Sequence, residues 1–381
     1  PLIIRLMDSA TQRQARQNAL CSEALDAQEA GDLENACRGF LAAVRTGPSN
    51  PVPLLFLGHA LAQNDERERA AAAWSLAADR DARIINAWRH GAREDIAVRS
   101  KAADSGIRQW FTALHQQAMD AFAQRHPPAQ FERIRDAVWC QTHDGEIEFQ
   151  AVEQRPYVFY VPDLAPLTVF THREAPWLKA LEAAFEDILN EYRAAHADTK
   201  GHVRPYLDWP VDRTNPLANL AQSDAWGALH LFKQSEPNAS VLAKFPKTLE
   251  ALHELPLLEV GGHPREVLFS VLAGGERINP HYGLANTDAT VHLPLIVPGP
   301  AALRVVDGTY PWEPGRALAF DDSFLHESWN DAEQARVTLL FEAWHPDLSP
   351  IECDAVQFAF EYRDRWNRRR QDLMLGTTTQ R

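Results

Sequence analysis

Residues 290–297 read TVHLPLIV and residues 336–344 read RVTLLFEAW, and these two stretches decide the fold of the second half of the chain. Both are short and rich in β-branched and aromatic residues, which is typical of β-strands. Three further stretches have the same character: EVLFSVLA (266–273), ALRVV (302–306) and RALAF (316–320). Proline and glycine turns separate them and leave no room for the helices that parallel strands require. The sequence therefore predicts an antiparallel jelly roll or barrel.

The first hundred residues follow a different pattern, in which alanine and leucine recur at helical spacing. When residues 17–50 are placed over 51–84, the period is 34 residues and like residues coincide. The matched pairs are Ala36 with Ala70, Phe40 with Trp74, Ala43 with Ala77 and Ala24 with Gly58. This pattern resembles tetratricopeptide repeats, which stack helical hairpins on one another. A non-repetitive helical bundle is the alternative.

These two patterns predict an α+β chain of several domains. We expect a helical, tetratricopeptide-like domain at residues 1–135, a linker at 136–155, and a double-stranded β-helix (jelly roll) with flanking helices at 156–381. The break at Pro127-Pro128 ends the helical part. One of the flanking helices is expected to begin at Glu174.

Composition restricts the partners and the compartment. The 381 residues carry 38 basic and 52 acidic side chains, a formal charge of −14, so nucleic acid and membrane surfaces are poor partners. The opening segment, PLIIRLMDSATQRQ, has too short an apolar run for a secretory signal, and no stretch is apolar enough to span a bilayer. The four cysteines (Cys21, Cys37, Cys140 and Cys353) form no CxxC motif. We expect a cytoplasmic protein.

Two of the fifteen histidines have settings that suggest a metal site. His281 lies in INPHYGLAN, just before one predicted strand, and His326 lies in FDDSFLHESW, just after another. They are far enough apart to converge at one open end of a small roll. Neutral imidazoles suit iron(II), with coordination positions left for a co-substrate and oxygen. His253 and His263 lack any HExxH frame and are interpreted as structural.

Arg336 begins the last predicted strand, ten residues after His326. A 2-oxoacid that chelates a metal needs a fixed cation for its far carboxylate, and a planar guanidinium binds a carboxylate through two hydrogen bonds. The structural alternative is an internal salt bridge, which requires a carboxylate beside Arg336.

The stretches NPHYGLANTDATVHLPLIVPG, WEPGRALAFDDSFLHESWND and ARVTLLFEAWHPDLSP closely resemble the aspartyl/asparaginyl β-hydroxylase family. The resemblance covers roughly residues 155–350, and some members also carry tetratricopeptide-like helices. It implies that His281 and His326 are the iron ligands and that Arg336 and Ser270 hold the distal carboxylate of 2-oxoglutarate. It also implies that His292 contacts the metal-side carboxylate.

Three further positions, Gly283, Asp322 and Thr290, bear on the expected metal and co-substrate sites. Many oxygenases of this chemistry have Asp or Glu two residues after the first histidine, whereas this chain has Gly283, as expected for a family with two histidine ligands and no carboxylate ligand. Asp322 is our candidate to hold the water in the vacant position, and a turn residue at a strand end is its structural alternative. The resemblance places an arginine where this chain has Thr290, which carries no charge, so we expect co-substrate binding to be weaker or to be served by another residue.

The implied reaction couples oxidative decarboxylation of 2-oxoglutarate by O₂, at iron(II), to hydroxylation of an unactivated C–H bond, with release of succinate and CO₂. The implied substrate is an Asp or Asn residue of a peptide or protein, for which the helical repeats offer a concave surface. Arg204, Arg213 and Lys233 are candidates to hold an acidic side chain, although a surface role is the plainer interpretation. Free amino acids and natural-product peptides are alternative substrates.

Two alternatives belong to other classes. A non-catalytic interaction protein could combine a repeat scaffold with a degenerate roll, but it would have no need of both histidines and Arg336 together. A cupin-type metal enzyme that uses no oxoacid would show a closely spaced HxH motif, which this chain lacks. The arginine-rich tail EYRDRWNRRRQDLM is interpreted as a solvated helix end, with an acidic partner as the alternative.

Overall fold

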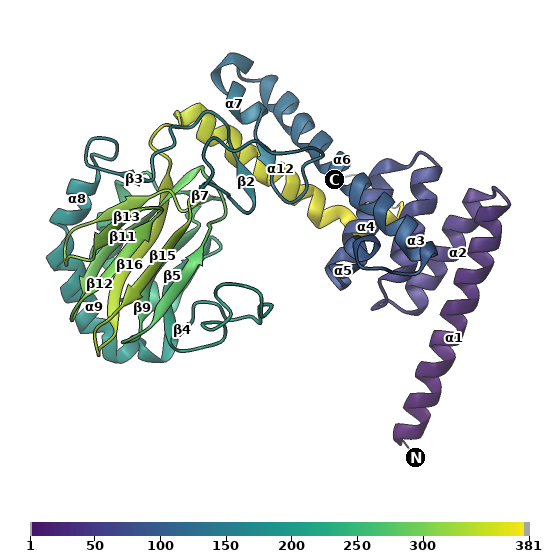
Figure 1. Cartoon of the computed structure of the whole chain (residues 1–381), viewed down its shortest axis with the longest axis horizontal. Helices are drawn as coiled ribbons and strands as arrows, with labels where there is room; N and C mark the ends of the chain where they lie inside the picture. The colour runs from purple at the N-terminus through teal and green to yellow at the C-terminus, as the bar shows by residue number, and fades with distance from the viewer. Residues whose placement is uncertain (1, 377–381) are drawn as a thin grey trace. The chain divides into compact units, whose positions relative to one another are not determined.

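The computed structural model describes residues 2–376, with side chains from residue 10 onward, and the chain forms two compact units (Figure 1). The first unit is helical and comprises residues 2–127, 142–146 and 358–376. The second comprises residues 128–141 and 147–357 and carries the sheets. The predicted combination of N-terminal helices and C-terminal antiparallel sheets is therefore confirmed.

The boundaries of these units differ from the predicted ones at the end of the chain. We assigned residues 156–381 to the β domain, whereas the part of helix α12 (Pro350–Leu375) from residue 358 onward belongs to the helical unit. The reason is apolar packing that the arginine-rich sequence conceals. Trp366 is buried, and its ring centroid lies 5.2 Å from that of Phe111 and 5.8 Å from that of Trp110.

The helical unit begins with two antiparallel pairs of helices. They are α1 (Leu2–Glu29) with α2 (Leu33–Thr46) and α3 (Val52–Gln63) with α4 (Arg67–Arg80). Helices α2 and α4 both have 14 residues, and their first residues are 67 − 33 = 34 positions apart. The left-handed turn residues before them, Gly31 (φ 81°) and Asp65 (φ 59°), are also 65 − 31 = 34 positions apart. The helices thus follow the period that the sequence predicted. The elements after them are α5 (Arg83–Asn86), η1 (Ala87–Arg89) and α6 (Glu94–Ala123).

Trp74 organises the core of this unit. Its indole lies so close to Gly58 of α3 and Gly106 of α6 that a β-carbon at either glycine would collide with it. The indole N–H donates to the carbonyl of Leu55 at 3.2 Å, which satisfies the one polar atom of the buried ring. Small residues on two neighbouring helices therefore make room for one large aromatic side chain.

The second unit contains two main antiparallel sheets. The larger has the order β3-β14-β11-β16-β9-β5-β4, with β6 paired to β5, and the smaller has the order β10-β15-β12-β13. Bounds in the larger sheet are β3 (Val169–Phe170), β14 (Leu318–Phe320), β11 (Asp288–Ile296), β16 (Arg336–Trp344), β9 (Glu266–Leu272), β5 (Trp226–Lys233), β4 (Arg204–Pro205) and β6 (Glu236–Pro237). Bounds in the smaller are β10 (Arg277–His281), β15 (His326–Asn330), β12 (Ala301–Val305) and β13 (Gly308–Pro311).

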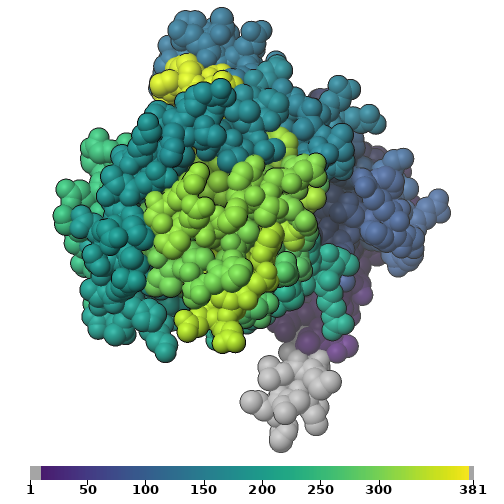
Figure 2. Space-filling view, turned by 60° about the vertical axis from the view of Figure 1, so that its left-hand side comes forward, coloured from purple at the N-terminus to yellow at the C-terminus, as the bar shows by residue number. Residues whose placement is uncertain are grey.

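Successive strands from β9 to β16 go to alternate sheets, apart from the hairpin of β12 and β13 within the smaller sheet. A cavity lined by residues of both sheets lies between them. The other face of the larger sheet, with Phe269, Val291 and Phe341, is covered by helices. These are α8 (Leu178–Ala183), α9 (Phe185–Thr199), α10 (Ala239–Leu242) and α11 (Pro246–His253). Figure 2 shows the light-green surface of the late strands bordered by the teal surface of the segment before β4.

The remaining elements of this unit are short. They are η2 (Pro128–Gln130), α7 (Glu132–Arg135), β1 (Val138–Trp139), β2 (Phe159–Tyr160), η3 (Lys200–His202), β7 (Glu259–Val260) and β8 (His263–Pro264). The helix predicted from Glu174 is two helices, because the chain turns at Ala184 between α8 and α9. Between residues 2 and 376, no helix is both long enough and apolar enough to cross a membrane. The four cysteines are unpaired thiols.

We predict that Trp74→Ala lowers the free energy of unfolding by about 3–5 kcal/mol, because it leaves a cavity between three helices. Urea denaturation of the full chain, followed by far-ultraviolet circular dichroism, measures this. Val98→Ala in α6 is the control: Val98 is 56% exposed, and its truncation should cost less than about 0.5 kcal/mol. Equal losses in the two variants would show that Trp74 does not organise this core.

Candidate active site

The two predicted metal ligands lie side by side. His281 is the last residue of β10 and His326 the first of β15, and the two are paired in the register of the smaller sheet. Their ring centroids are 4.2 Å apart. Antiparallel pairing therefore brings together two imidazoles that are 326 − 281 = 45 positions apart in the sequence.

Each imidazole is oriented by a backbone carbonyl two residues before it. Nδ1 of His281 lies 2.8 Å from the carbonyl oxygen of Asn279, and Nδ1 of His326 lies 2.9 Å from that of Phe324. A proton on Nδ1 that is donated to a carbonyl leaves the lone pair on Nε2 available for a metal. Burial lowers the pKa of both rings, and for His326 burial together with the neighbouring His281 lowers the pKa to about 3. Both rings are therefore in the neutral form that binds metals.

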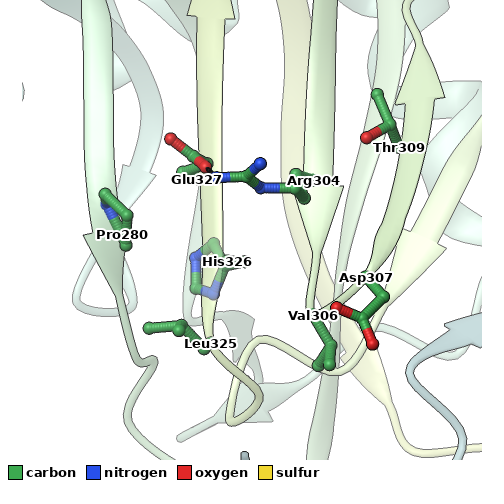
Figure 3. Close-up of a pocket in the computed structure, with 8 residues that line it drawn as sticks. All are labelled: Pro280, Arg304, Val306, Asp307, Thr309, Leu325, His326 and Glu327. Carbon is green, nitrogen blue, oxygen red and sulfur yellow. Dashed lines mark hydrogen bonds and ion pairs between the residues drawn. The ribbon is translucent and has the colours of Figure 1, made fainter.

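Figure 3 shows the outer side of this strand pair. His326 borders a hollow there with Pro280 and Leu325, while the next residue, Glu327, forms an ion pair with Arg304 of β12. His326 also lines the cavity between the sheets. His326 thus lies at the boundary between the inner cavity and the outer hollow. No group of three or more His, Cys, Asp or Glu side chains in the described part of the chain is arranged to hold a metal, so the two imidazoles form a pair alone.

Arg336 is fully buried at the start of β16 and lines the same cavity. One Nη atom donates to Ser328 Oγ at 3.2 Å, the other lies 3.5 Å from Thr338 Oγ1, and Nε has no partner. Among residues 10–376, no carboxylate lies within ion-pair distance of this guanidinium. Burial lowers its pKa to about 10, which leaves it charged at neutral pH. The salt-bridge alternative is therefore wrong for the described residues, and Arg336 is a buried cation without an anion.

Polar side chains from both sheets surround this guanidinium. Ser270 of β9 lies opposite Thr338 in the strand register, and its hydroxyl accepts a hydrogen bond from the Trp226 indole at 3.1 Å. His292 Nδ1 lies 3.2 Å from the Thr338 hydroxyl, and burial followed by the charge of Arg336 holds the pKa of His292 well below its usual range. The cavity they share has a volume of about 90 Å³. An anionic co-substrate would find a cation and several hydroxyl groups there.

Asp322 occupies the space that a side chain at Gly283 would take, since a β-carbon built on Gly283 would collide with the Asp322 carboxylate. The Gly283 N–H donates to the Asp322 carbonyl at 2.6 Å, and the Thr290 hydroxyl donates to Asp322 Oδ2 at 3.0 Å. The other carboxylate oxygen, Oδ1, is buried and has no partner. Burial, followed by the neighbouring Asp321, raises the pKa of Asp322 to about 7. Thr290 thus positions Asp322 through a hydrogen bond, a role that the sequence did not suggest.

Several residues of the cavity were missed in the sequence. Glu342, Glu266 and Tyr206 line its wall, and Arg265 binds Glu342 through two hydrogen bonds of 2.5 and 2.6 Å. The position of Glu342 could have been predicted from the sequence, because every second residue from Arg336 along β16 faces the same side of the sheet. Tyr206 and Arg265 lie in segments without strong strand patterns and carried no such signal.

The candidate substrate-binding cations do not line this cavity. Arg204 is exposed and donates to the backbone carbonyls of Gly201 and Val203. Arg213 is exposed as well. The ammonium of Lys233 binds Asp208 at 2.8 Å. The plainer interpretation of these three as surface residues agrees with their positions.

The fold and site define a domain of two antiparallel sheets with a polar cavity between them. The family resemblance expected from the sequence is confirmed, because residues 182–346 match the family model described as aspartyl/asparaginyl beta-hydroxylase. This segment contains both imidazoles and Arg336.

Individual relatives agree with that match. The chain is similar to human aspartyl/asparaginyl beta-hydroxylase, with 30% identity over 56% of this chain and 27% of the human protein. Identity is 31% with aspartate beta-hydroxylase domain-containing protein 2 of Xenopus tropicalis, over 54% of this chain and 55% of that protein. Identity is 28% with bovine aspartate beta-hydroxylase domain-containing protein 1, over 68% of this chain and 70% of that protein. The chain thus spans about a quarter to about half of the length of the first two of these relatives.

We predict opposite stability effects for Arg336, which is fully buried, and for Arg265, which is partly buried and directly precedes β9. Arg336→Met removes a desolvated charge that has no counter-ion, and should raise the free energy of unfolding of the ligand-free protein by about 1–3 kcal/mol. Arg265→Met leaves Glu342 and Asp288 without their cation, and should lower it by about 3–5 kcal/mol. Denaturant unfolding at neutral pH measures both. A destabilised Arg336→Met protein would indicate that the guanidinium has a purely structural role.

Proposed function

We propose that the chain is an iron(II)- and 2-oxoglutarate-dependent hydroxylase whose sheets form a double-stranded β-helix. The observation that carries this proposal is a buried guanidinium without a counter-ion that lines one cavity together with two neutral imidazoles whose Nδ1 atoms are held by backbone carbonyls. A buried charge without a partner is costly, so its retention favours a ligand that supplies the anion. The alternation of strands between the two sheets supports the β-helix assignment.

His281 and His326 would hold the metal through Nε2, since their Nδ1 atoms are hydrogen-bonded to the backbone. Iron(II), when bound with 2-oxoglutarate and O₂, supplies the oxidising power for C–H hydroxylation, and succinate and CO₂ are released. The fixed carbonyl partners prevent the rings from rotating, so the protein provides a preorganised ligand pair. Phe320 packs edge-on against His326, at 5.2 Å between ring centroids, and supports its orientation from the cavity side.

Arg336 and Ser270 would bind the distal carboxylate of 2-oxoglutarate. The guanidinium offers its unpartnered Nε and two Nη donors, and the Ser270 hydroxyl has a free proton because its oxygen accepts from Trp226. His292 would contact the metal-side carboxylate through Nε2, because Nδ1 faces the Thr338 hydroxyl. The rings of Trp312 and Phe320 flank His292 and exclude water from this part of the cavity.

Asp322 would orient a water molecule beside the metal. Its unpartnered Oδ1 lies against Gly283, in the volume that a side-chain carboxylate fills in oxygenases with Asp or Glu at this position. The Thr290 hydroxyl fixes the other oxygen. The glycine therefore has a physical role, which is to make room for a carboxylate that comes from a distant part of the chain.

The family likeness favours an Asp or Asn residue of a peptide or protein as the site of hydroxylation, with a free amino acid or natural-product peptide as the alternative. The helical unit is a candidate holder for a peptide. Its 34-residue period supports tetratricopeptide-like hairpins, which bind extended chains on a concave face. A non-catalytic scaffold is disfavoured because it would retain an unpaired buried arginine without need.

We predict that His326→Ala abolishes both oxygen transfer and succinate release while folding persists. Wild-type protein is incubated with iron(II), 2-oxoglutarate and a peptide library, and products are analysed by mass for the gain of one oxygen atom. The second readout is the visible absorption of an iron(II)–oxoacid chelate, recorded without oxygen, which should also disappear. His253→Ala, an exposed histidine on α11, should retain both signals. Turnover that survives in His326→Ala would remove the metal assignment.

A further inference from the structure

The inner face of the larger sheet changes charge along its length. On β16, Arg336 and Glu342 point into the same cavity from positions six residues apart, a separation of roughly 20 Å along a strand. Arg336 lies at the end proposed for 2-oxoglutarate. Glu342 lies at the other end, directly opposite Thr290 in the strand register. Because Thr290 binds Asp322, which packs against Gly283, the acidic end is the one near the imidazole pair.

Carboxylates outnumber cations at this end. Glu342 and Asp288 both bind Arg265, the latter at 3.2 Å, so one guanidinium serves two carboxylates. Glu266 and Asp322 also line the cavity or its wall, and neither forms an ion pair with Lys or Arg among the described residues. The nearest basic side chain to Glu266 is His230, at 3.5 Å. Burial lowers the pKa of His230 to about 4, so this ring is neutral and does not compensate the charge.

The electrostatics of these groups agree with an excess of negative charge. Burial and the neighbouring Glu342 raise the pKa of Glu266 to about 7. Burial, with the added effect of Glu266, Glu342 and Asp322, raises the pKa of the Tyr206 hydroxyl as well. A bound cation would relieve this repulsion.

An aromatic wall lies beside these carboxylates. Tyr206 stacks on Trp226, with 4.1 Å between ring centroids and 16° between ring planes, and both rings line the cavity. Flat aromatic faces next to carboxylates form a favourable environment for an ammonium or guanidinium group. Among residues 10–376, Arg336 is the one Lys or Arg side chain that lines this cavity, so a substrate carboxylate beside Glu266 and Glu342 would meet repulsion.

We propose that the substrate presents a cationic group, an ammonium or a guanidinium, to Glu266, Glu342 and Tyr206 beside the carbon that is hydroxylated. This inference rests on the proposed hydroxylase function and deepens it. The family likeness suggests the chemistry, whereas the charge of this cavity selects the substrate. An aspartate side chain would then be the poorest ligand of a matched series, and an arginine or lysine side chain the best.

The test uses four peptides of one sequence that differ at a central residue: arginine, its neutral isostere citrulline, asparagine or aspartate. Dissociation constants are measured by calorimetry without oxygen, with the full chain, iron(II) and 2-oxoglutarate, and turnover is then followed by succinate release. We expect the arginine peptide to bind at least about tenfold more tightly than the citrulline peptide, as loss of a hydrogen bond to a charged group implies. The aspartate peptide should bind most weakly.

Glu266→Gln keeps the shape of the side chain and removes its charge, and it should reduce the preference for arginine over citrulline towards one. Glu259→Gln, an exposed glutamate on β7 of the same unit, should retain the preference. Any result without a preference for the cation, including no binding of any peptide, overturns the proposal. Loss of the iron(II)–oxoacid absorption in wild-type protein would instead contradict the hydroxylase function, because peptide binding is measured separately.

Discussion

The cavity of the β unit is arranged around one uncompensated charge, the guanidinium of Arg336. It is fully buried, donates to two hydroxyl groups, lies over the Trp312 ring at 5.3 Å from the ring centroid, and leaves one N–H unsatisfied. Hydrophobic residues of similar size would pack in its place at lower cost. The two sheets place the hydroxyl groups of Ser270, Ser328 and Thr338 near it. These hydroxyl groups solvate the charge but do not neutralise it. The interior is therefore arranged for an anion that the protein does not itself provide.

The two ends of the cavity differ in charge, because the antiparallel strands that form it are continuous and run from one end to the other. Strand β16 carries a cation at its start and a carboxylate near its end. Its neighbours β9 and β11 have a neutral polar residue, Ser270 or His292, towards the first end and a carboxylate, Glu266 or Asp288, towards the other. The imidazole pair belongs to the other sheet and lies near the acidic end. A co-substrate and a substrate of opposite charge would thus be sorted to opposite ends by the same strands, without a separate binding domain for each.

Local backbone geometry completes the site at two places. Carbonyl groups two residues before each histidine fix the imidazole tautomer, and a glycine without a side chain admits a carboxylate from a loop nearly forty positions away in the sequence. Both devices use the backbone, so they are tolerant of changes in neighbouring side chains. In the helical unit, close packing follows the same principle, since Gly58 and Gly106 admit the indole of Trp74.

The sequence by itself determined the helical or strand character of the main segments and some of the polar residues that line the cavity, such as His281, His326 and Arg336. The runs at 266–273 and 336–344 are strands because β-branched and aromatic residues recur there, and the 34-residue period in the first hundred residues appears in the bounds of α2 and α4. Only the tertiary structure decided which charges meet. Whether Arg336 has a carboxylate partner, whether Asp322 fills the place beside Gly283, and whether Glu266 and Glu342 gather around Tyr206 depends on strand register and on loops. These place residues from distant segments within a few ångströms, and no local pattern encodes that distance.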